Sequence, residues 1–176
     1  TVQEQPTGEL SVGAGFSSVD SFTVNLGISE RNFRGRGQNV VARLEWGSLR
    51  QQVDFRFTEP KFLGRDLRAG FDLFHSRYDL SEYSSYDYRS TGGGLRLSYP
   101  LNGYTLFSAR YFLKSDEIIV PNSYCNSGGL GSSALCDQVG SYLNSSVGYT
   151  LQVNRTNDPV RPTRGWAGSL RQDFAG

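Results

Sequence analysis

The chain has 176 residues, and its 18 Lys and Arg against 17 Asp and Glu give a formal net charge of +1. This near-neutral balance gives no electrostatic basis for binding nucleic acid or an acidic partner. No apolar run reaches the ~18 residues that a membrane-spanning helix needs, whereas 21 glycines and 13% aromatic residues favour many short strands and turns.

Apolar and polar residues alternate along the first four predicted segments. The apolar positions are Leu10, Val12, Ala14 and Phe16, then Phe22, Val24, Leu26 and Ile28, then Val40, Ala42, Leu44 and Trp46, and then Val53, Phe55 and Phe57. A period of two fits β-strands with one apolar side and cannot form a helical stripe. Gly35 and Gly37 supply the positive φ that a tight reversal needs between the second and third segments.

The same alternation continues to the end of the chain. The apolar positions are Leu67, Ala69, Phe71 and Leu73, then Leu95, Leu97 and Tyr99, then Phe107, Ala109, Tyr111 and Leu113, then Leu143, Val147, Tyr149, Leu151 and Val153, and finally Trp166, Leu170 and Phe174. No stretch has helical periodicity. The chain therefore predicts an all-β protein of about nine antiparallel strands, of a length that can cross a bilayer at a tilt.

The predicted connections form two sets that an up-and-down meander places at opposite ends of the strands. One set contains the two longest connections, residues 76–88 and 116–141, and the other contains shorter turns such as "NFRGRGQ" and "PLNG". Membrane β-barrels carry long external loops at one end and shorter turns at the other. The last connection of the second set, "NRTNDPVRPTRG", is not short.

The face opposite the apolar one is charged. Whether the apolar face meets lipid or a protein core distinguishes a membrane barrel from a soluble sandwich. The charged residues of the opposite face are Arg43, Glu45, Asp54, Arg56, Arg68, Asp72, Arg96, Arg110 and Lys114. A membrane barrel turns such a face inward, whereas a soluble β-sandwich buries the apolar face in its core. Trp46 and Tyr149 lie in phase with the apolar side near predicted strand ends, as in an interfacial girdle, which favours lipid. The sandwich, as an adhesion module, remains the alternative.

No residue pattern predicts catalysis or a cofactor. His75 is the only histidine, so the chain has no second candidate for a catalytic triad or a histidine cluster, and we expect His75 at the rim or in the lumen. The "GGG" at Gly92–Gly94 predicts a bend or a close backbone approach rather than a phosphate cradle. We expect no catalytic residue, no metal and no cofactor.

Four stretches are similar, in order, to landmarks of the Omp85 superfamily: "VQEQPTGELSVGAGFSS", "ISERNFRGRGQNV", "FTEPKFLGRDL" and "DPVRPTRGW". The first resembles the first barrel strand of that superfamily, and the next two resemble its inner turns. The residues that carry the two turn motifs are Asn32, Phe33, Gly35, Gly37, Glu59, Pro60 and Phe62. The resemblance runs along nearly the whole chain and is closest to the outer-membrane protein assembly factors.

The resemblance implies an incomplete antiparallel up-and-down transmembrane β-barrel in the outer membrane of a Gram-negative bacterium. Residues 1–176 would supply about nine of about sixteen strands, as the N-terminal portion of the barrel domain. POTRA repeats and the closing strands would lie outside this chain, which we therefore expect to be a processed or excised part.

The resemblance also implies a non-enzymatic role in inserting outer-membrane proteins. The implied partners are unfolded outer-membrane protein clients, other subunits of the assembly machinery and the lipid bilayer, with no nucleic acid. Another Omp85 member, a translocation pore or an autotransporter-assembly protein, is the alternative within the superfamily.

The resemblance places one side of a lateral gate at the first strand, where client strands would pair edge to edge. Its residues are Glu9, Leu10, Ser11, Val12, Gly13, Ala14, Gly15 and Phe16. An unpaired edge templates another strand, and the glycines weaken its register, so that pairing can exchange. The alternative is that these glycines only relieve barrel curvature.

Cys125 and Cys136 lie in the long predicted loop 116–141. Two cysteines with no neighbouring histidine do not make a zinc site, and nothing nearby would lower a thiol pKa to make a reactive pair. In an oxidising envelope we expect them to form a disulfide that stabilises the loop by ~3 kcal/mol.

Overall fold

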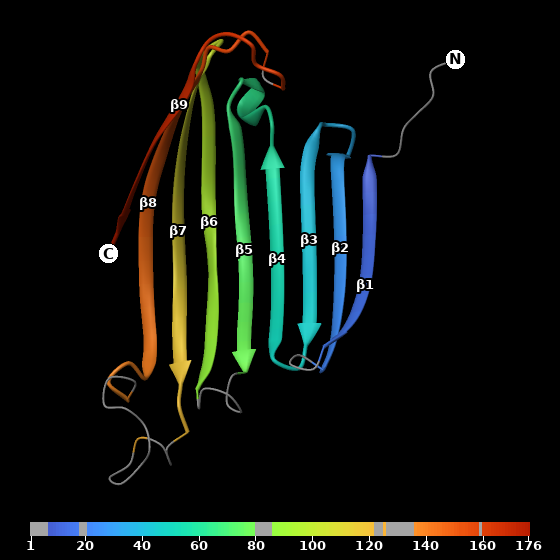
Figure 1. The fold of residues 1–176 in the computed structure, drawn as a ribbon, viewed down its shortest axis with the longest axis vertical. Coiled ribbons are helices and arrows are strands. Elements are labelled where there is room, and N and C mark those ends of the chain that lie inside the picture. Colours follow the sequence, from blue (N-terminus) through green and yellow to red (C-terminus); the bar gives the residue numbers. More distant parts are fainter. Residues whose placement is uncertain (1–6, 18–20, 80–85, 122–124, 126–135, 159) are drawn as a thin grey trace.

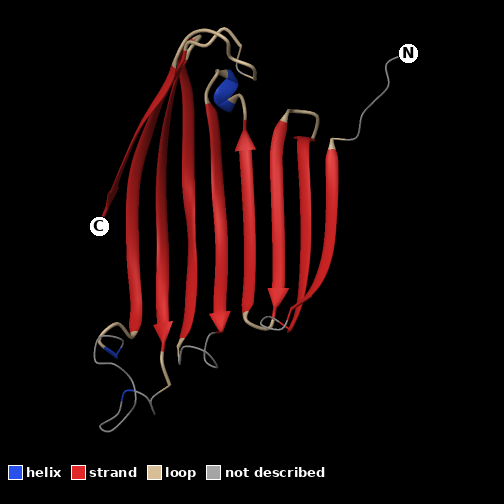
Figure 2. Ribbon diagram, in the orientation of Figure 1, coloured by secondary structure: helices blue, strands red, loops and turns tan. Residues whose placement is uncertain are grey.

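The computed structural model describes residues 7–17, 21–79, 86–121, 125, 136–158 and 160–176. Within these residues the chain forms nine strands and one short 3-10 turn (Figure 2). The elements are β1 (Gly8–Ser17), β2 (Ser21–Phe33), β3 (Gln38–Gly47), β4 (Arg50–Glu59), η1 (Phe62–Gly64), β5 (Arg68–Asp79), β6 (Asp87–Asn102), β7 (Thr105–Ile119), β8 (Gly140–Asn154) and β9 (Ala167–Ala175).

The nine strands form one sheet in which every strand pairs with its neighbours in sequence, in the order β1 to β9 (Figure 1). All eight pairings are antiparallel. The turns that follow β2, β4, β6 and β8 lie at one end of the sheet, and the β3–β4 turn lies at the opposite end. The predicted all-β, up-and-down order is therefore confirmed. No described helix has the length and apolar character needed to cross a membrane.

The strand register sorts the side chains onto two faces, because residues that are directly opposite across a ladder point to the same side. Leu44 is opposite Leu26 and Val53, and Phe71 is opposite Phe57 and Leu95. We call the side that carries these residues the apolar face and the other side the polar face. The alternation predicted from the sequence thus gives one continuous apolar surface across the sheet.

The apolar face is not packed against a second sheet, so the β-sandwich alternative is wrong for the described residues. Trp46 is 58% exposed and Leu95 is 60% exposed. Among the described residues the only buried apolar side chain is Val120, whereas Asp72 and Ser90 are buried polar residues. Asp72 and Ser90 both lie on the polar face, so polar side chains are buried there while large apolar side chains are exposed on the other face, which is the reverse of a soluble sandwich.

β6 includes the Gly92–Gly94 run within the strand. Two aromatic rings lie against this run on the polar face. A Cβ on Gly94 would lie 2.4 Å from the Phe112 ring, and a Cβ on Gly92 would lie 2.8 Å from Cζ of Phe74. The run therefore marks a close approach of rings to backbone, as one of the two predicted readings required.

Three sequence expectations about individual residues have different outcomes. Trp46 lies on the apolar face at the end of β3, as predicted. Tyr149 lies within β8 rather than near its end, because β8 begins at Gly140 and extends to Asn154. His75 lies on the apolar face, opposite Val53 and Thr91, and its Nδ1 is 2.7 Å from Oγ1 of Thr91. Its place is therefore on the membrane side and not in the lumen.

Candidate functional site

β1 forms one edge of the sheet, and within the described residues it pairs with β2 alone. The Arg31 N–H donates to the Thr7 carbonyl at 3.1 Å, which continues the β1–β2 ladder. Since bonded and non-bonded pairs alternate in an antiparallel ladder, the odd-numbered residues of β1 bond to β2. The backbone N–H and C=O groups of the even-numbered residues, from Gly8 to Phe16, therefore face the open edge.

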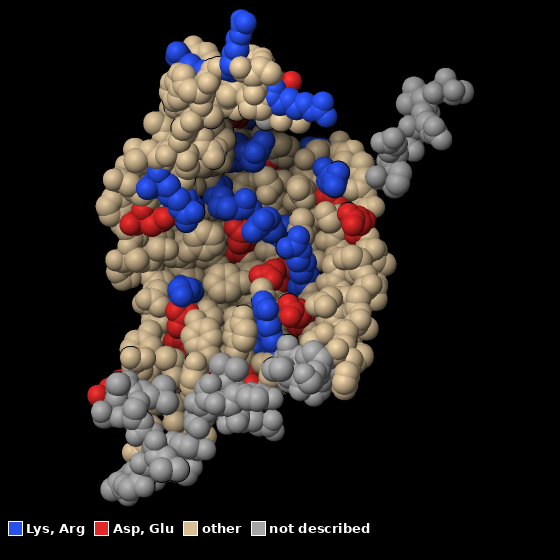
Figure 3. Space-filling model, viewed as in Figure 1, with Lys and Arg blue, Asp and Glu red and all other residues tan. Residues whose placement is uncertain are grey.

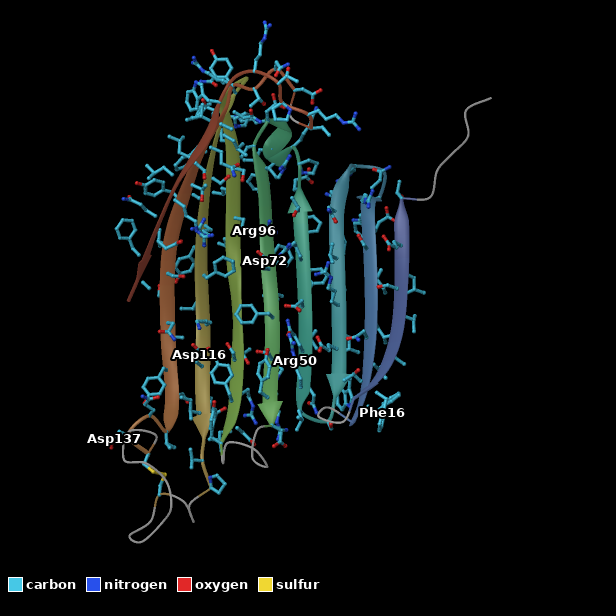
Figure 4. All side chains as sticks on the ribbon, in the orientation of Figure 1. Phe16, Arg50, Asp72, Arg96, Asp116 and Asp137 are labelled. Atoms are coloured by element: carbon cyan, nitrogen blue, oxygen red, sulfur yellow. A yellow bond between two sulfur atoms is a disulfide. The ribbon has the colours of Figure 1, made fainter. Side chains whose placement is uncertain are left out.

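The side chains of β1 give this edge little packing of its own. Leu10 and Val12 are each 70% exposed. Phe16 is 83% exposed and lies near the C-terminal end of β1, which we call the loop end of the sheet (Figure 4). On the polar face, Ser11 Oγ donates to the Gly27 carbonyl at 3.3 Å. A Cβ on Gly27 would lie 2.4 Å from that hydroxyl oxygen, so the small residues allow the two strands to pair closely.

The β2–β3 turn is a tight reversal that is built by Phe33, Arg34, Gly35 and Arg36. Arg34 and Gly35 have φ of 58° and 69°, and the Arg36 N–H donates to the Phe33 carbonyl at 3.3 Å. Positive φ at both central residues is the type I′ geometry that suits a hairpin. The sequence predicted positive φ at Gly35, but Arg34 carried no such signal.

Asn32 and Gly37 close this turn from the side. Asn32 Oδ1 accepts a hydrogen bond from the Gly37 N–H at 2.7 Å, and Gly37 has φ of 68°. The Asn32 N–H itself donates to Glu30 Oε1 at 2.8 Å. The asparagine of the "NFRGRG" motif thus closes the turn through a hydrogen bond between its side chain and the backbone.

The β4–β5 turn uses the same device at Phe62–Arg65. Leu63 and Gly64 have φ of 57° and 71°, and the Arg65 N–H donates to the Phe62 carbonyl at 3.2 Å. Because Leu63 is left-handed, η1 is a reverse turn rather than a regular helical piece. The Phe62 N–H donates to the Leu67 carbonyl at 2.8 Å, which closes the loop at its base.

A side-chain bridge joins the two turns. Gln38 Nε2 donates to Glu59 Oε2 at 2.6 Å, and the other carboxylate oxygen accepts the Lys61 N–H at 3.1 Å. A Cβ on Gly37 would lie 3.7 Å from Cγ of Pro60. The structure therefore brings the predicted motif residues Gly37, Glu59 and Pro60 together, and it adds Gln38, which sequence reasoning missed.

Charged side chains gather over the middle strands of the polar face (Figure 3). Asp72 on β5 accepts hydrogen bonds from Arg56 Nε at 2.7 Å and from Arg96 Nε at 2.5 Å. Asp72 is only 8% exposed. One carboxylate on β5 thus joins β4, β5 and β6. The two guanidinium groups compensate its burial through hydrogen bonds and opposite charge.

A second carboxylate, Asp116 on β7, organises the polar face nearer the loop end (Figure 4). It accepts hydrogen bonds from Tyr88 at 2.8 Å, from Ser90 at 2.6 Å and from Asn144 at 2.9 Å, and it pairs with Lys114 Nζ at 2.6 Å. The arrangement ties β6, β7 and β8 together. It is a structural network and offers no open ligand position, and no group of metal-ligating side chains occurs among the described residues.

The β8–β9 connection is held by its own side chains. Asn157 Oδ1 accepts hydrogen bonds from the Thr163 and Arg164 N–H groups at 3.1 and 2.9 Å. Asp158 Oδ1 accepts from the Val160 and Arg161 N–H groups at 2.7 and 3.0 Å. The Arg161 and Val160 N–H groups lower the pKa of Asp158 below its usual value. This explains how a connection that is not short remains ordered.

Cys125 and Cys136 are joined by a disulfide with a Cα–Cα distance of 5.7 Å. The pairing predicted from the sequence is therefore confirmed. No described cysteine is free. The bridge lies in the connection between β7 and β8, whereas the sequence motifs lie in the β2–β3 and β4–β5 turns (Figure 4).

Comparisons with known proteins agree with this geometry. Residues 32–176 match the Omp85 superfamily domain. The chain is 25% identical over 175 residues to the outer membrane protein assembly factor BamA of Neorickettsia risticii, covering 99% of this chain and 23% of that protein. It is also 25% identical to BamA of Nitratidesulfovibrio vulgaris, covering 99% of this chain and 21% of that protein.

The same relationship is visible in three dimensions. The fold resembles the crystal structure of BamA from Haemophilus ducreyi lacking POTRA domains 1-3, with a TM-score of 0.62 and 19% identity. The match covers 98% of this chain and 35% of that one. The chain thus spans less than a quarter of the length of the two curated relatives.

Proposed function

The chain belongs to the Omp85 superfamily, and from this premise we propose that it helps to assemble outer-membrane proteins by offering the open edge of β1 to their strands. The chain is part of an outer-membrane β-barrel protein of a Gram-negative bacterium. Its relatives are assembly factors and not enzymes. Client outer-membrane proteins and the other subunits of the assembly machinery are the proposed partners.

The observation that carries the proposal is the open edge itself. Within the part of the chain that the structure describes, the even-numbered residues of β1 present backbone donors and acceptors that no other strand pairs, and such groups pair readily with an incoming strand. Gly13 and Gly15 leave little side-chain packing along this edge, so one partner strand can replace another. The client supplies the free energy through its own hydrogen bonding and burial, so that no nucleotide is needed.

The open edge also requires a partner within the parent protein. We propose that the nine strands are the first part of a barrel of about sixteen strands, and that its last strand faces β1 across a seam. The β2–β3 and β4–β5 turns, which the Gln38–Glu59 hydrogen bond joins, would hold the strand ends in place while the seam opens. An Omp85 translocation pore would need no strand exchange at this seam, so the seam distinguishes the two roles.

A reversible lock across the seam tests the proposal. A cysteine at Val12 would be paired with a cysteine in the closing strand of the full-length parent protein, and client insertion would be measured in proteoliposomes. We expect the oxidised protein to stop inserting clients and the reduced protein to resume.

The matched control places the cysteine pair at Val53 and His75, which are directly opposite on β4 and β5. This lock joins two strands that never separate, so insertion should continue. Undiminished insertion with the Val12 lock complete would contradict the proposal and leave barrel curvature as the role of the glycines.

A further inference from the structure

A hollow of about 500 Å³ lies on the apolar face at the end of the sheet that carries the motif turns. Phe57, Phe71, Leu95 and Leu97 line it, and Phe62 of η1 contributes the wall at the turn end. Phe57 and Phe71 have ring centroids 5.5 Å apart. The hollow therefore has firm aromatic and aliphatic walls that belong to three neighbouring strands and one turn.

Ala69 explains why this part of the face is hollow. It lies in register between Glu59 on β4 and Leu97 on β6, and its side chain is too small to fill the space between them. The volume falls within the range of sites that hold small ligands. An apolar occupant is favoured because it makes dispersion contacts with this lining.

The turn end of the hollow is polar. Gln38 and Glu59 are part of the lining, and the carboxylate of Glu59 is held by hydrogen bonds from the Gln38 amide and the Lys61 N–H. Lys61 and Arg65 flank η1 in the chain and are exposed. The hollow thus runs from an apolar wall to a polar end formed by Gln38 and Glu59, and the turn that follows Glu59 carries two exposed cations.

We propose that this hollow holds an acyl chain of one phospholipid from the leaflet at the inner turns. The phosphate would face Lys61 and Arg65, and a headgroup ammonium would face Glu59. The apolar face meets lipid tails in the membrane, so the acyl chain of the phospholipid reaches the hollow directly from the bilayer. A carboxylate that is followed in the chain by two exposed cations can complement a zwitterionic headgroup such as phosphatidylethanolamine, whereas a purely anionic headgroup would also meet the charge of Glu59.

Native mass spectrometry of the full-length parent protein in detergent, with phosphatidylethanolamine added, tests this site. The wild-type protein should retain one lipid molecule. Ala69→Phe fills the hollow from its floor and should lower retention about tenfold. Ala109→Phe adds the same ring to the same face on β7, outside the hollow, and should retain the lipid. Heat-modifiable gel mobility confirms that both variants are folded.

The headgroup contacts are tested with two charge variants that leave the hollow intact. Lys61→Glu with Arg65→Glu should weaken retention of phosphatidylethanolamine but not of diacylglycerol, which lacks the phosphate. Arg161→Glu with Arg164→Glu, in the β8–β9 connection, is the matched control and should change neither.

Two results would overturn the inference. Equal retention by Ala69→Phe and wild type would mean that the lipid is bound around the barrel without a site in the hollow. Equal retention of phosphatidylglycerol and phosphatidylethanolamine would remove the role of Glu59 as the partner of an ammonium group. Neither result bears on client insertion, so this site and the proposed function are tested separately.

Discussion

The carboxylate of Asp72 accepts a hydrogen bond from Arg96 Nε at 2.5 Å, across the pairing of β5 with β6. Its other oxygen accepts from Arg56 Nε on β4 at 2.7 Å. The side chain of Arg56 is 62% exposed and that of Asp72 is 11% exposed. The Asp72 carboxylate is therefore the buried member of this ion-pair network.

Replacing Asp72 should therefore destabilise the barrel. Asp72→Asn removes the charge that both guanidinium groups face, and we expect the free energy of unfolding of the full-length protein to fall by about 2 kcal/mol. Urea unfolding in detergent micelles measures this change. Asp54→Asn is the control, because Asp54 lies on the same face and accepts a hydrogen bond from the neutral amide of Gln52, with no ion pair within the described residues. Equal losses in the two variants would contradict the special role of Asp72.

The rings that lie against the Gly92–Gly94 run make a second prediction. In Gly94→Ala the new methyl group would overlap the Phe112 ring, and overpacking of this kind costs about 2 kcal/mol. Gly103→Ala is the control, since nothing lies within 4 Å of a Cβ at that position. The double variant Gly94→Ala with Phe112→Leu should recover part of the loss. Urea unfolding that fails to distinguish Gly94 from Gly103 would refute the packing argument.

The disulfide should act on its own loop and not on the barrel. Replacing Cys125 and Cys136 with serine removes a constraint worth ~3 kcal/mol in the chain-entropy estimate. We expect proteases to cut the β7–β8 connection faster, while heat-modifiable mobility of the full-length protein stays the same. Unchanged proteolysis would show that the connection is ordered by other contacts.

The β8–β9 connection should respond to acid. The N–H groups of Arg161 and Val160 lower the pKa of Asp158 below 3.8, so the carboxylate contributes stability at pH values above its unfolded pKa. That contribution is lost as the pH falls through the lower folded pKa. The amide proton shifts of Arg161 and Val160 should titrate with a midpoint below 3.8, and in Asp158→Asn this titration should disappear. A midpoint above 3.8 would contradict the hydrogen bonding.

The alternation of residues such as Leu44 and Arg43 was enough to predict the strands and their two faces, because a period of two depends only on local backbone geometry. Strand lengths were less predictable. The connection predicted at residues 76–88 was too long, because β5 extends to Asp79 and β6 begins at Asp87, and the extent of both strands depends on their pairing.

In the candidate site, too, some features could be predicted from the sequence and others could not. The "NFRGRG" and "FTEPKF" motifs located the two rim turns, since glycine marks positive φ. The left-handed conformations of Arg34 and Leu63, and the Gln38–Glu59 bridge, could not be read from the sequence. The left-handed conformations belong to the geometry of each reverse turn, whereas the bridge forms because the two hairpins lie side by side in the sheet, which is a tertiary property.

The apolar face touches hydrocarbon, while the polar face lines the barrel interior. Spin labels at Arg43, Leu44, Asp54 and Phe55 of the full-length protein in bilayers would test it, by their accessibility to oxygen and to a polar nickel chelate. Labels at Leu44 and Phe55 should be accessible to oxygen, and labels at Arg43 and Asp54 should be accessible to the chelate. Labels at Leu44 and Phe55 that are shielded from both reagents would place the apolar face in a dry protein core and contradict the account.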